Sequence, residues 1–349
     1  MVNLAMGYSV KQCEALPVAD TLAELWRRNL HIPADIDLQE RVRWAYRDGP
    51  AGAGRVQLLV AGGPGGEAVV GCAGIVVRQF SVAGRPVPLQ AALLGDLAVD
   101  RSHRTLLPAL TLVRATRATA LEQAIVYGYP NATSAPVLQR VGYRKLGTLT
   151  RWVRVLRHAP YIEREVKRPW LARAAGALLD GARLLQAAAA RGPLVLEPLD
   201  DVDERLDRMW DEARGPWGVI GRRDAAYLRW RFLHQPGGRY QLIALSERGT
   251  RRVRAYAVLE QIEHAFHLRD FFGVSLLDVG ALLDRLVPYC YRRGGVSLSV
   301  AFLGAPSVER LLREHHFHAR EATRTVVVDG EAAAPPAAEW YLTDGDEDW

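Results

Sequence analysis

One segment of the sequence has the residue types and spacing of a binding site for an anion. Residues 96–115 read DLAVDRSHRTLLPALTLVRA, in which an apolar strand ending at Val99 leads through a short basic turn into a helix. The free backbone N–H groups and the positive dipole end at such a helix start attract anions. Arg104 adds a positive charge, and Pro108 fits because early helical amides need no partner. The alternative is a strand–turn–helix unit that only packs.

A second segment, residues 125–147, reads IVYGYPNATSAPVLQRVGYRKLG and again follows a strand with a turn and a helix. Asn131 comes after the strand, and a glycine followed by Tyr143 ends the short helix. Together with Arg104 and Ala109 of the basic loop, these residues resemble the acyl-CoA site of the GNAT superfamily of N-acetyltransferases. The whole chain is similar to bacterial two-domain proteins of this kind.

The resemblance implies where an acyl-CoA donor, acetyl-CoA or another, would bind. The superfamily's loop has Arg or Gln, two residues, Gly, one residue, then Gly or Ala, and Leu107 stands here in place of the first glycine. The pantetheine arm would enter a slot between two diverging strands like an added strand. The residues assigned to the donor are Leu97, Val99, Arg104, Thr105, Leu106, Leu107, Ala109 and Asn131.

Transfer from acyl-CoA would be the direct attack of an amine on a thioester. This reaction needs a base for the ammonium proton and an acid for the departing thiolate. Asp96 is the candidate base or amine anchor, and the alternative is a carboxylate hydrogen-bonded to the diverging strands. The resemblance places a tyrosine acid four residues before the helix-ending glycine, where this chain has Leu138. Tyr143 is the candidate acid, with Tyr127 and Tyr129 as alternatives, and the other interpretation is that each of these tyrosines is a core aromatic.

The elements that must position these residues follow from hydrophobic periodicity. Over residues 8–157 the pattern predicts the order β α α β β β α β α β. A helix is expected over 38–46, and GGPGG at 62–66 is expected to be a hairpin turn. Asp20 is expected to cap the helix that begins near residue 19.

An internal repeat is the feature that most constrains the architecture. The segments ERVRWAYRDGPAGAGRVQLLV and AYLRWRFLHQPGGRYQLIAL both place an Arg-Trp-x-aromatic helix before Pro-x-Gly and an Arg-led apolar strand. In this alignment Trp44 corresponds to Trp230, and Asp96 corresponds to Asp270. Because two unrelated domains would not share this order of signals, the sequence predicts a duplication.

We therefore predict an α/β protein of two tandem GNAT-like domains, each a mixed, mostly antiparallel twisted sheet flanked by helices. Residues 1–157 form the acyl-CoA-binding domain, and residues 158–193, rich in Ala and Arg, form a helical connector. Residues 194–349 form a degenerate second copy, because the segment after Asp270 has neither Arg nor a Gly-rich turn. Residues 340–342 are expected to dock as a final strand, followed by a solvated acidic tail.

Composition and charge argue against several classes of binding partner for this protein. The net charge is +6, but no compact basic run favours nucleic acid. Three distant cysteines form no CxxC pair, so neither a metal site nor a disulfide framework is expected, and a reducing cytoplasm fits. The start lacks the pattern of a signal peptide, and no apolar run is long enough to span a membrane. The oligomeric state is left open.

The sequence thus predicts an N-acyltransferase that moves an acetyl or other acyl group from acyl-CoA to a small-molecule amine or amino sugar. Two alternatives remain open at this stage. One is a non-catalytic acyl-CoA-binding or scaffold protein, which the leucines at 107 and 138 would favour. The other is a transferase whose donor is an acyl- or aminoacyl-charged carrier.

Overall fold

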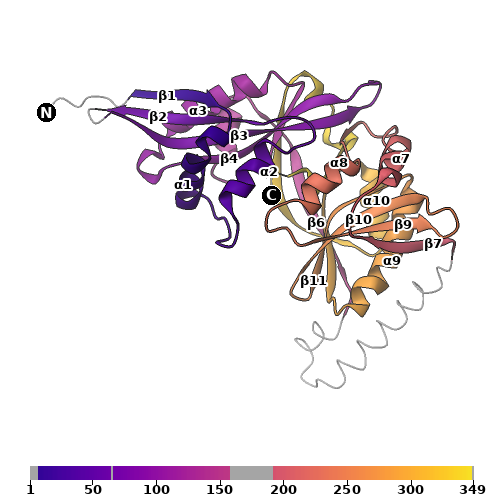
Figure 1. Cartoon of the computed structure of the whole chain (residues 1–349). Coiled ribbons are helices and arrows are strands. Elements are labelled where there is room, and N and C mark those ends of the chain that lie inside the picture. The colour runs from indigo at the N-terminus through magenta and orange to yellow at the C-terminus, as the bar shows by residue number, and fades with distance from the viewer. Residues whose placement is uncertain (1–6, 64–65, 158–191, 348–349) are drawn as a thin grey trace.

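The computed structural model of the protein describes residues 7–63, 66–157 and 192–347. Fourteen strands of this part form one continuous, twisted sheet along the length of the molecule (Figure 1). Most neighbouring strands are antiparallel, and helices cover both faces. The predicted α/β class, with mixed, mostly antiparallel strands flanked by helices, is confirmed. The predicted connector lies almost wholly outside the described residues.

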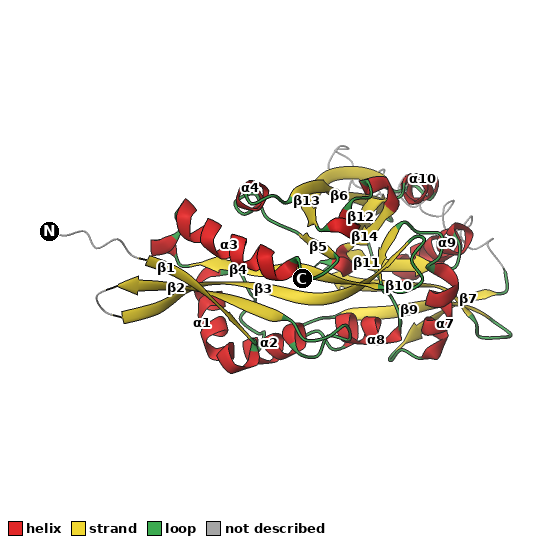
Figure 2. Ribbon diagram, turned by 90° about the horizontal axis from the view of Figure 1, so that it is seen from above, coloured by secondary structure: helices red, strands yellow, loops and turns green. Residues whose placement is uncertain are grey.

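The first half of the chain follows the predicted order of elements. Its strands are β1 (Gly7–Cys13), β2 (Arg55–Gly63), β3 (Gly66–Val82), β4 (Leu89–Val99), β5 (Ile125–Gly128) and β6 (Arg144–Val155). Its helices are α1 (Ala19–Asn29), α2 (Leu38–Tyr46), α3 (Leu106–Ala120) and α4 (Ala135–Arg140). Helices α1 and α2 cover one face of the sheet, whereas α3 and α4 lie on the other (Figure 2).

The second half repeats the alternation of strands and helices. Its strands are β7 (Leu194–Leu199), β8 (Val219–Gly221), β9 (Tyr240–Glu247), β10 (Val253–Ile262), β11 (Ala265–Gly273), β12 (Ser297–Gly304), β13 (His318–Asp329) and β14 (Trp340–Thr343). Its helices are α7 (Glu204–Ala213), α8 (Ala225–Leu228), α9 (Leu276–Arg292) and α10 (Pro306–Glu314). A short π-helical turn, Arg229–Leu233, continues α8.

The two halves exchange strands at the centre of the sheet. From one edge the order is β1-β2-β3-β4-β5-β13-β6-β12-β11-β10-β9-β7. Strand β13, from the end of the chain, therefore lies between β5 and β6, and β6 lies between β13 and β12. From either edge of the sheet, five strands of one half are followed by one strand of the other half, which is β13 from the first edge and β6 from the second. Neither half completes its sheet alone, and the division into two domains stays a prediction.

Two tryptophans mark the contact between the halves. The rings of Trp44 and Trp230 stack with centroids 5.0 Å apart. The indole N–H of Trp44 donates to the carbonyl of Trp230 at 2.7 Å, and that of Trp230 donates to the carbonyl of Trp44 at 2.8 Å. Such reciprocal contacts are typical of equivalent residues across a two-fold axis, as the sequence repeat would place them.

Local signals explain the first two helices, with one correction. Helix α2 begins after Asp37, whose carboxylate accepts hydrogen bonds from the backbone N–H groups of Gln39 and Glu40. The prediction that Asp20 caps α1 is wrong. A 3₁₀ turn, Leu16–Val18, leads directly into this helix, and Asp20 lies in its first turn, accepting a hydrogen bond from the side chain of Gln39.

The acidic end of the chain is buried, which corrects the expectation of a solvated tail. Strand β14 pairs with β12 and β8, so the predicted final strand is confirmed. After it, Asp346 is 0% exposed and Glu347 is 6% exposed. The Asp346 carboxylate accepts a hydrogen bond from Arg223 at 2.5 Å, in a site where both side chains are fully buried. The buried arginines compensate the tail's charge, which a composition-based expectation does not take into account.

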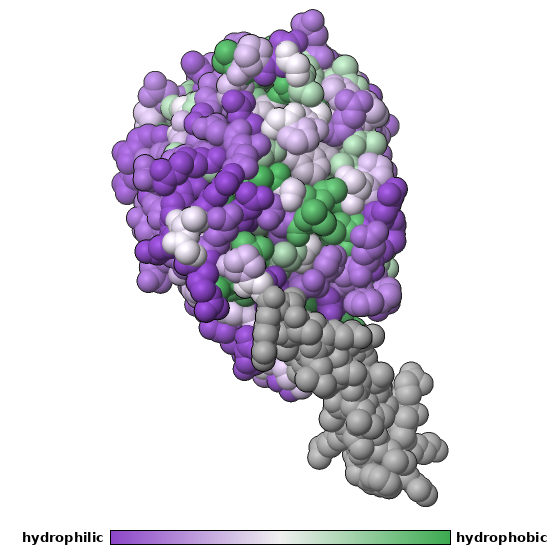
Figure 3. Space-filling view, turned by 90° about the vertical axis from the view of Figure 1, so that its right-hand side faces the viewer, coloured by the Kyte–Doolittle hydropathy of each residue, from purple (hydrophilic) through white to green (hydrophobic). Residues whose placement is uncertain are grey.

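One face of the molecule, at the end formed by the second half, is mainly polar. Figure 3 shows this end of the molecule as mostly hydrophilic, with a few hydrophobic residues gathered near the middle of the face. None of the helices in the described ranges has the length and hydropathy needed to cross a membrane.

Candidate active site

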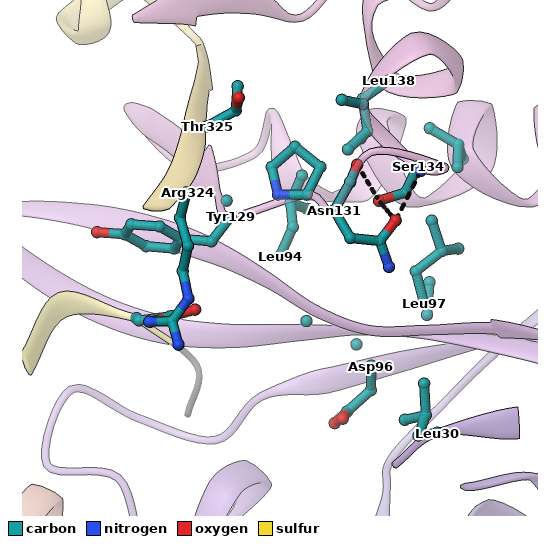
Figure 4. A pocket seen from close by; sticks show the side chains of 18 of the residues that line it. Leu30, Leu94, Asp96, Leu97, Tyr129, Asn131, Ser134, Leu138, Arg324 and Thr325 are labelled. Carbon is teal, nitrogen blue, oxygen red and sulfur yellow. Dashed lines mark hydrogen bonds and ion pairs between the residues drawn. The ribbon is translucent and has the colours of Figure 1, made fainter. Parts of the chain in front are cut away.

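A cavity of about 710 Å³ opens where β4 and β5 diverge. Residues 91–94 of β4 pair in parallel with residues 125–128 of β5, and the pairing stops there. Beyond this point the cavity is lined by Leu94 to Leu97, by the segment after β5, by α3 and α4, and by part of β13 (Figure 4). The predicted slot between diverging strands therefore has a counterpart in the structure.

A β-bulge shapes the β4 wall of this cavity. The register between β3 and β4 shifts between Cys72 and Gly74, which leaves Asp96 and Leu97 out of the regular ladder. Asp96 has φ of +53°, a conformation that few residues other than glycine adopt. A bulge of this kind takes backbone groups out of the ladder and redirects the side chains. In Figure 4 Asp96 points to one side of the strand and Leu97 to the other.

The Asp96 carboxylate is held by two buried side chains. One oxygen accepts a hydrogen bond from Arg41 at 2.6 Å, and the other accepts one from the Tyr46 hydroxyl at 2.5 Å. Burial, and then the nearby Asp96 charge, raises the pKa of Tyr46 well above its usual value. Gly74 makes room for this tyrosine, because a Cβ there would lie 1.8 Å from the Tyr46 hydroxyl oxygen. Asp96 thus lines the cavity with both oxygens already bonded.

The basic loop before α3 is folded against the end of α1. The Nε of Arg104 donates to the Val99 carbonyl at 2.7 Å, and its Nη2 donates to the Asn29 side chain at 2.9 Å. The first helical turn is open to solvent, with Leu106 49% exposed and Leu107 64% exposed. Arg104 therefore holds the loop in place while its guanidinium remains near the surface.

The structure brings together only part of the predicted site. Asp96, Leu97, Asn131 and Tyr143 all line the cavity. The other predicted donor residues lie along the loop and first helical turn outside this lining: Val99, Arg104, Thr105, Leu106, Leu107 and Ala109. Their assignment to the donor stays a prediction.

Asn131 starts the turn that leads into α4. Its side-chain oxygen accepts hydrogen bonds from the backbone N–H of Thr133 at 3.0 Å and of Ser134 at 2.9 Å. This side-chain turn is a common way to begin a helix. It also fixes the end of β5, so Asn131 contributes to the shape of the cavity mouth (Figure 4).

Two tyrosines, Tyr129 and Tyr143, line the cavity. The hydroxyls of Tyr129 and Tyr143 are buried, and among the described residues neither has a hydrogen-bond partner. Burial is the main cause that raises the pKa of both tyrosines. Leu138, at the position where the resemblance implies a tyrosine acid, also lines the cavity. A buried hydroxyl beside a cavity can be satisfied by a ligand.

Comparison with known proteins bears on the fold. No family model and no curated protein matches the sequence. Among solved structures, a probable N-acyltransferase from Enterococcus faecalis matches with a TM-score of 0.63 and 12% identity, over 92% of this chain and 72% of the other. A GCN5-related N-acetyltransferase from Kribbella flavida matches with a TM-score of 0.59 and 13% identity, over 95% and 73%. Eis1 from Mycobacterium abscessus matches with a TM-score of 0.57 and 14% identity, over 92% of this chain and 73% of the other.

The chain has the fold of the GCN5-related N-acetyltransferases. The resemblance read from the basic loop and the segment around Asn131 is therefore confirmed for the fold. These matches are all below 15% identity, so they establish the architecture and leave the ligands open.

In this GCN5-related fold the second half has its own diverging strands, but they are filled. Strands β11 and β12 pair in parallel as far as Leu268 and Val300. Farther along, Phe302 pairs with Thr150 of β6 on one side and with Thr343 of β14 on the other. Strand β14 therefore occupies the gap between β11 and β12, corresponding to the open cavity between β4 and β5.

Sequence reasoning missed the cavity residues that come from the second half. Arg324 and Thr325 of β13 line the cavity beside the segment after β5 (Figure 4). Glu347 of the tail also lines it. No local sequence pattern predicts them, because β13 and the tail reach the site from the other end of the chain. Within the described residues no group of His, Cys, Asp and Glu side chains could hold a metal ion.

Proposed function

We propose that the protein transfers an acyl group from acyl-CoA to the amine of a small molecule, in the cavity between β4 and β5. The observation that carries this proposal is the open gap beside the β-bulge at Asp96 and Leu97, in a fold shared with N-acetyltransferases. An extended pantetheine arm could pair with the free edge of β4, as an added strand does.

The reaction would proceed by direct attack. The nitrogen of the neutral amine forms a bond to the thioester carbonyl carbon, and the C–S bond then breaks. The ammonium proton leaves to a base or water, and the departing thiolate takes up a proton. Backbone N–H groups released from the ladder at the bulge would be suited to stabilise the oxygen of the tetrahedral intermediate.

Tyr143 is the proposed acid. Its hydroxyl lies in the cavity wall without a partner among the described residues, and the raised pKa keeps it protonated at neutral pH. Asp96 remains a candidate base, but its two short hydrogen bonds favour a role in holding the bulge. Tyr129 is the alternative acid because its hydroxyl is equally buried.

Acyl-CoA binding without transfer is the second candidate function. The observations that favour it are Leu138 at the implied position of the acid, and an exposed Leu107 in place of a loop glycine. Gly at that place would let backbone amides approach a phosphate more closely.

Two measurements on the wild-type protein separate these candidates. Isothermal titration with acetyl-CoA, longer acyl-CoAs and free CoA tests donor binding. A thiol-release assay with a panel of primary amines tests transfer. Binding with amine-dependent thiol release supports the transferase, and binding without release under every amine supports the second candidate. A protein that binds none of these donors would contradict both and favour a carrier-bound donor.

A further inference from the structure

A second cavity lies next to the proposed donor cavity, at the junction of the two halves. It measures about 300 Å³. The residues that line both cavities are His31, Ile32, Arg41, Arg324 and Glu347. The remaining wall comes from the turn after α1 and from the second half, including the apolar or aromatic side chains of Phe232 and Tyr240. A molecule in this second cavity would reach the donor at the shared wall.

A row of alternating charges forms one side of this second cavity. Arg269 contacts Glu260 at 2.6 Å and Asp344 at 2.8 Å. Arg324 contacts Asp344 at 3.5 Å and also pairs with Glu347. Three carboxylates therefore share two guanidinium groups, which leaves an excess of one negative charge along the row. Glu347 is the member that lines both cavities.

The opposite charge comes from Arg231. This side chain is 3% exposed and lines the same cavity. Its guanidinium donates to the carbonyls of Gly345 and Glu347, both at 3.1 Å, and to the side-chain oxygen of Gln235. Among the described residues its bonded partners are thus neutral oxygens. A buried cation with no bonded carboxylate is costly, so an anionic group of a ligand would be stabilised beside it.

We propose, on the basis of the transfer reaction inferred above, that the acceptor is a small amino carboxylate bound in this second cavity. Its ammonium group lies at Glu347, where the two cavities meet, and its carboxylate lies toward Arg231. The amine is then next to the thioester before it loses its proton, while the rest of the acceptor packs against Phe232 and Tyr240. The acceptor's ammonium group would match the excess negative charge of the row, and its carboxylate would match Arg231, which has no bonded carboxylate among the described residues.

The same charges disfavour acceptors that are only cationic. A polyamine or an unmodified amino sugar would bring positive groups toward Arg231, Arg269 and Arg324. One ammonium group of such an acceptor could lie at Glu347, as proposed for the amino carboxylate. Its remaining positive groups would meet the arginines at the other end of the cavity, where they are repelled.

The test varies the ligand and uses the unaltered protein. Isothermal titration without donor compares ω-amino carboxylates of increasing length, from glycine to 6-aminohexanoate, each with its amide and with the alkylamine of equal length. We expect one length to bind best, and to bind at least roughly tenfold tighter than its amide, as for the loss of a charge-assisted hydrogen bond. Equal affinity for the amide or alkylamine at every length, or tighter binding of spermidine, would overturn the proposal.

Variants then locate the two charges. Arg231→Gln should remove the preference for the carboxylate, Arg231→Lys should retain part of it, and Glu347→Gln should weaken amino carboxylates and alkylamines alike. Arg208→Gln, which removes an exposed arginine of α7, is the matched control. Because Arg231 also holds the tail, thermal melting of each variant shows whether it is folded. A folded Arg231→Gln protein that keeps the full preference for the carboxylate would contradict the proposed orientation.

Failure of this inference can be told apart from failure of the proposed function. Acetyl-CoA binding with turnover of plain alkylamines as fast as amino carboxylates would retain the transferase and reject this acceptor. Amino carboxylate binding that depends on Arg231, in a protein without affinity for any acyl-CoA, would retain the second cavity as a ligand site and reject the transfer reaction.

Discussion

The two halves of the molecule contain the same pair of diverging strands and use it differently. In the first half the gap beside Asp96 is an open cavity of about 710 Å³. In the second half β14 fills the gap, and the Tyr341 hydroxyl donates to the Phe271 carbonyl of β11 at 2.6 Å. A stretch of the protein's own chain thus lies where the first half is proposed to take an extended ligand.

A buried carboxylate lies beside the diverging strands in each half, and its hydrogen-bond partners are of the same types whether the gap is open or filled. Asp270 accepts hydrogen bonds from Arg223 at 3.2 Å and from the Tyr256 hydroxyl at 2.5 Å. Asp96 has the same types of partner. Because the pattern occurs beside the filled gap as well as the open one, a donor is not needed to explain it. We infer that both carboxylates support the diverging strands.

Emptying the filled gap should give the largest change in stability. Tyr341→Ala removes a ring that is 1% exposed and packs against Phe271 and Phe302. We expect the free energy of unfolding to fall by about 3–5 kcal/mol, as for other large aromatic residues in cores. Urea unfolding measures this loss, and acetyl-CoA titration should show unchanged donor binding in the folded protein.

Filling the open gap should weaken donor binding and change stability little. Leu97→Trp adds volume inside the cavity, so donor binding should weaken by roughly tenfold or more while stability changes by less than about 1.5 kcal/mol. Titration with acetyl-CoA and urea unfolding measure the two effects. If Tyr341→Ala abolished donor binding and Leu97→Trp did not, the roles of the two halves would have to be exchanged.

The shared carboxylates provide the next comparison. Asp96→Asn and Asp270→Asn should each lower the free energy of unfolding by about 2–4 kcal/mol, because each leaves a buried arginine less compensated. Both variants, if folded, should retain part of the acyl transfer. A normally stable Asp96→Asn protein without any transfer would show instead that Asp96 is the base.

The helix starts of α3 and α9 allow a matched pair of smaller changes. Leu107 and Leu277 are 64% and 85% exposed in corresponding first turns. Leu107→Gly should tighten acetyl-CoA binding roughly two- to fivefold through closer backbone approach, despite a helix-propensity cost of up to about 1 kcal/mol. Leu277→Gly should leave binding unchanged. Titration of both variants decides this, and an equal effect of the two would place the donor elsewhere.

The two edge strands of the sheet should differ in how their stability depends on pH. Hydrogen bonds from Arg205, and then from Arg251, lower the pKa of Glu197 on β7 to about 2. Since the folded pKa lies below the unfolded one, the stabilisation is present above about pH 4.5 and is lost as the pH falls toward 2. Glu197→Gln should therefore cost about 1–2 kcal/mol at pH 7, after allowance for solvent screening, and little near pH 2.

The exposed pair on the opposite edge is the control for that pH dependence. Lys11 of β1 contacts Glu67 with both side chains more than half exposed. Lys11→Gln should leave urea unfolding unchanged at either pH. A cost for Glu197→Gln that stays the same near pH 2 would show that packing, and not charge, explains it.

Local sequence signals were sufficient for most elements of the first half. Helix α2 could be predicted because its apolar spacing and its end are encoded in neighbouring residues, and the hairpin between β2 and β3 because glycines mark its turn. The segments around Trp44 and Trp230 could be paired because both carry the same residue types in the same order. The wrong cap at Asp20 arose because a preceding 3₁₀ turn, which has a weak sequence signal, took over the helix start.

The candidate site was predictable only where one segment of chain forms it. Asn131 and Leu97 follow directly from their strands, whereas Arg324 and Glu347 reach the cavity from the other end of the chain. The burial of Asp346 depends on Arg223, which lies 123 positions earlier in the chain. Periodicity and composition describe neighbours in sequence, so neither the strand exchange nor these long-range ion pairs could be predicted from them.

The position of β13 has a consequence for how the protein is made. Its partner residues in β6 and β5 leave the ribosome roughly 165 to 200 residues earlier, which corresponds to about 8–40 s of synthesis. During that interval both strands present unpaired edges, the kind of surface on which chains aggregate. The nascent protein therefore has to keep these edges apart from other chains until its last strands emerge, and a chain released before residue 318 would retain them permanently.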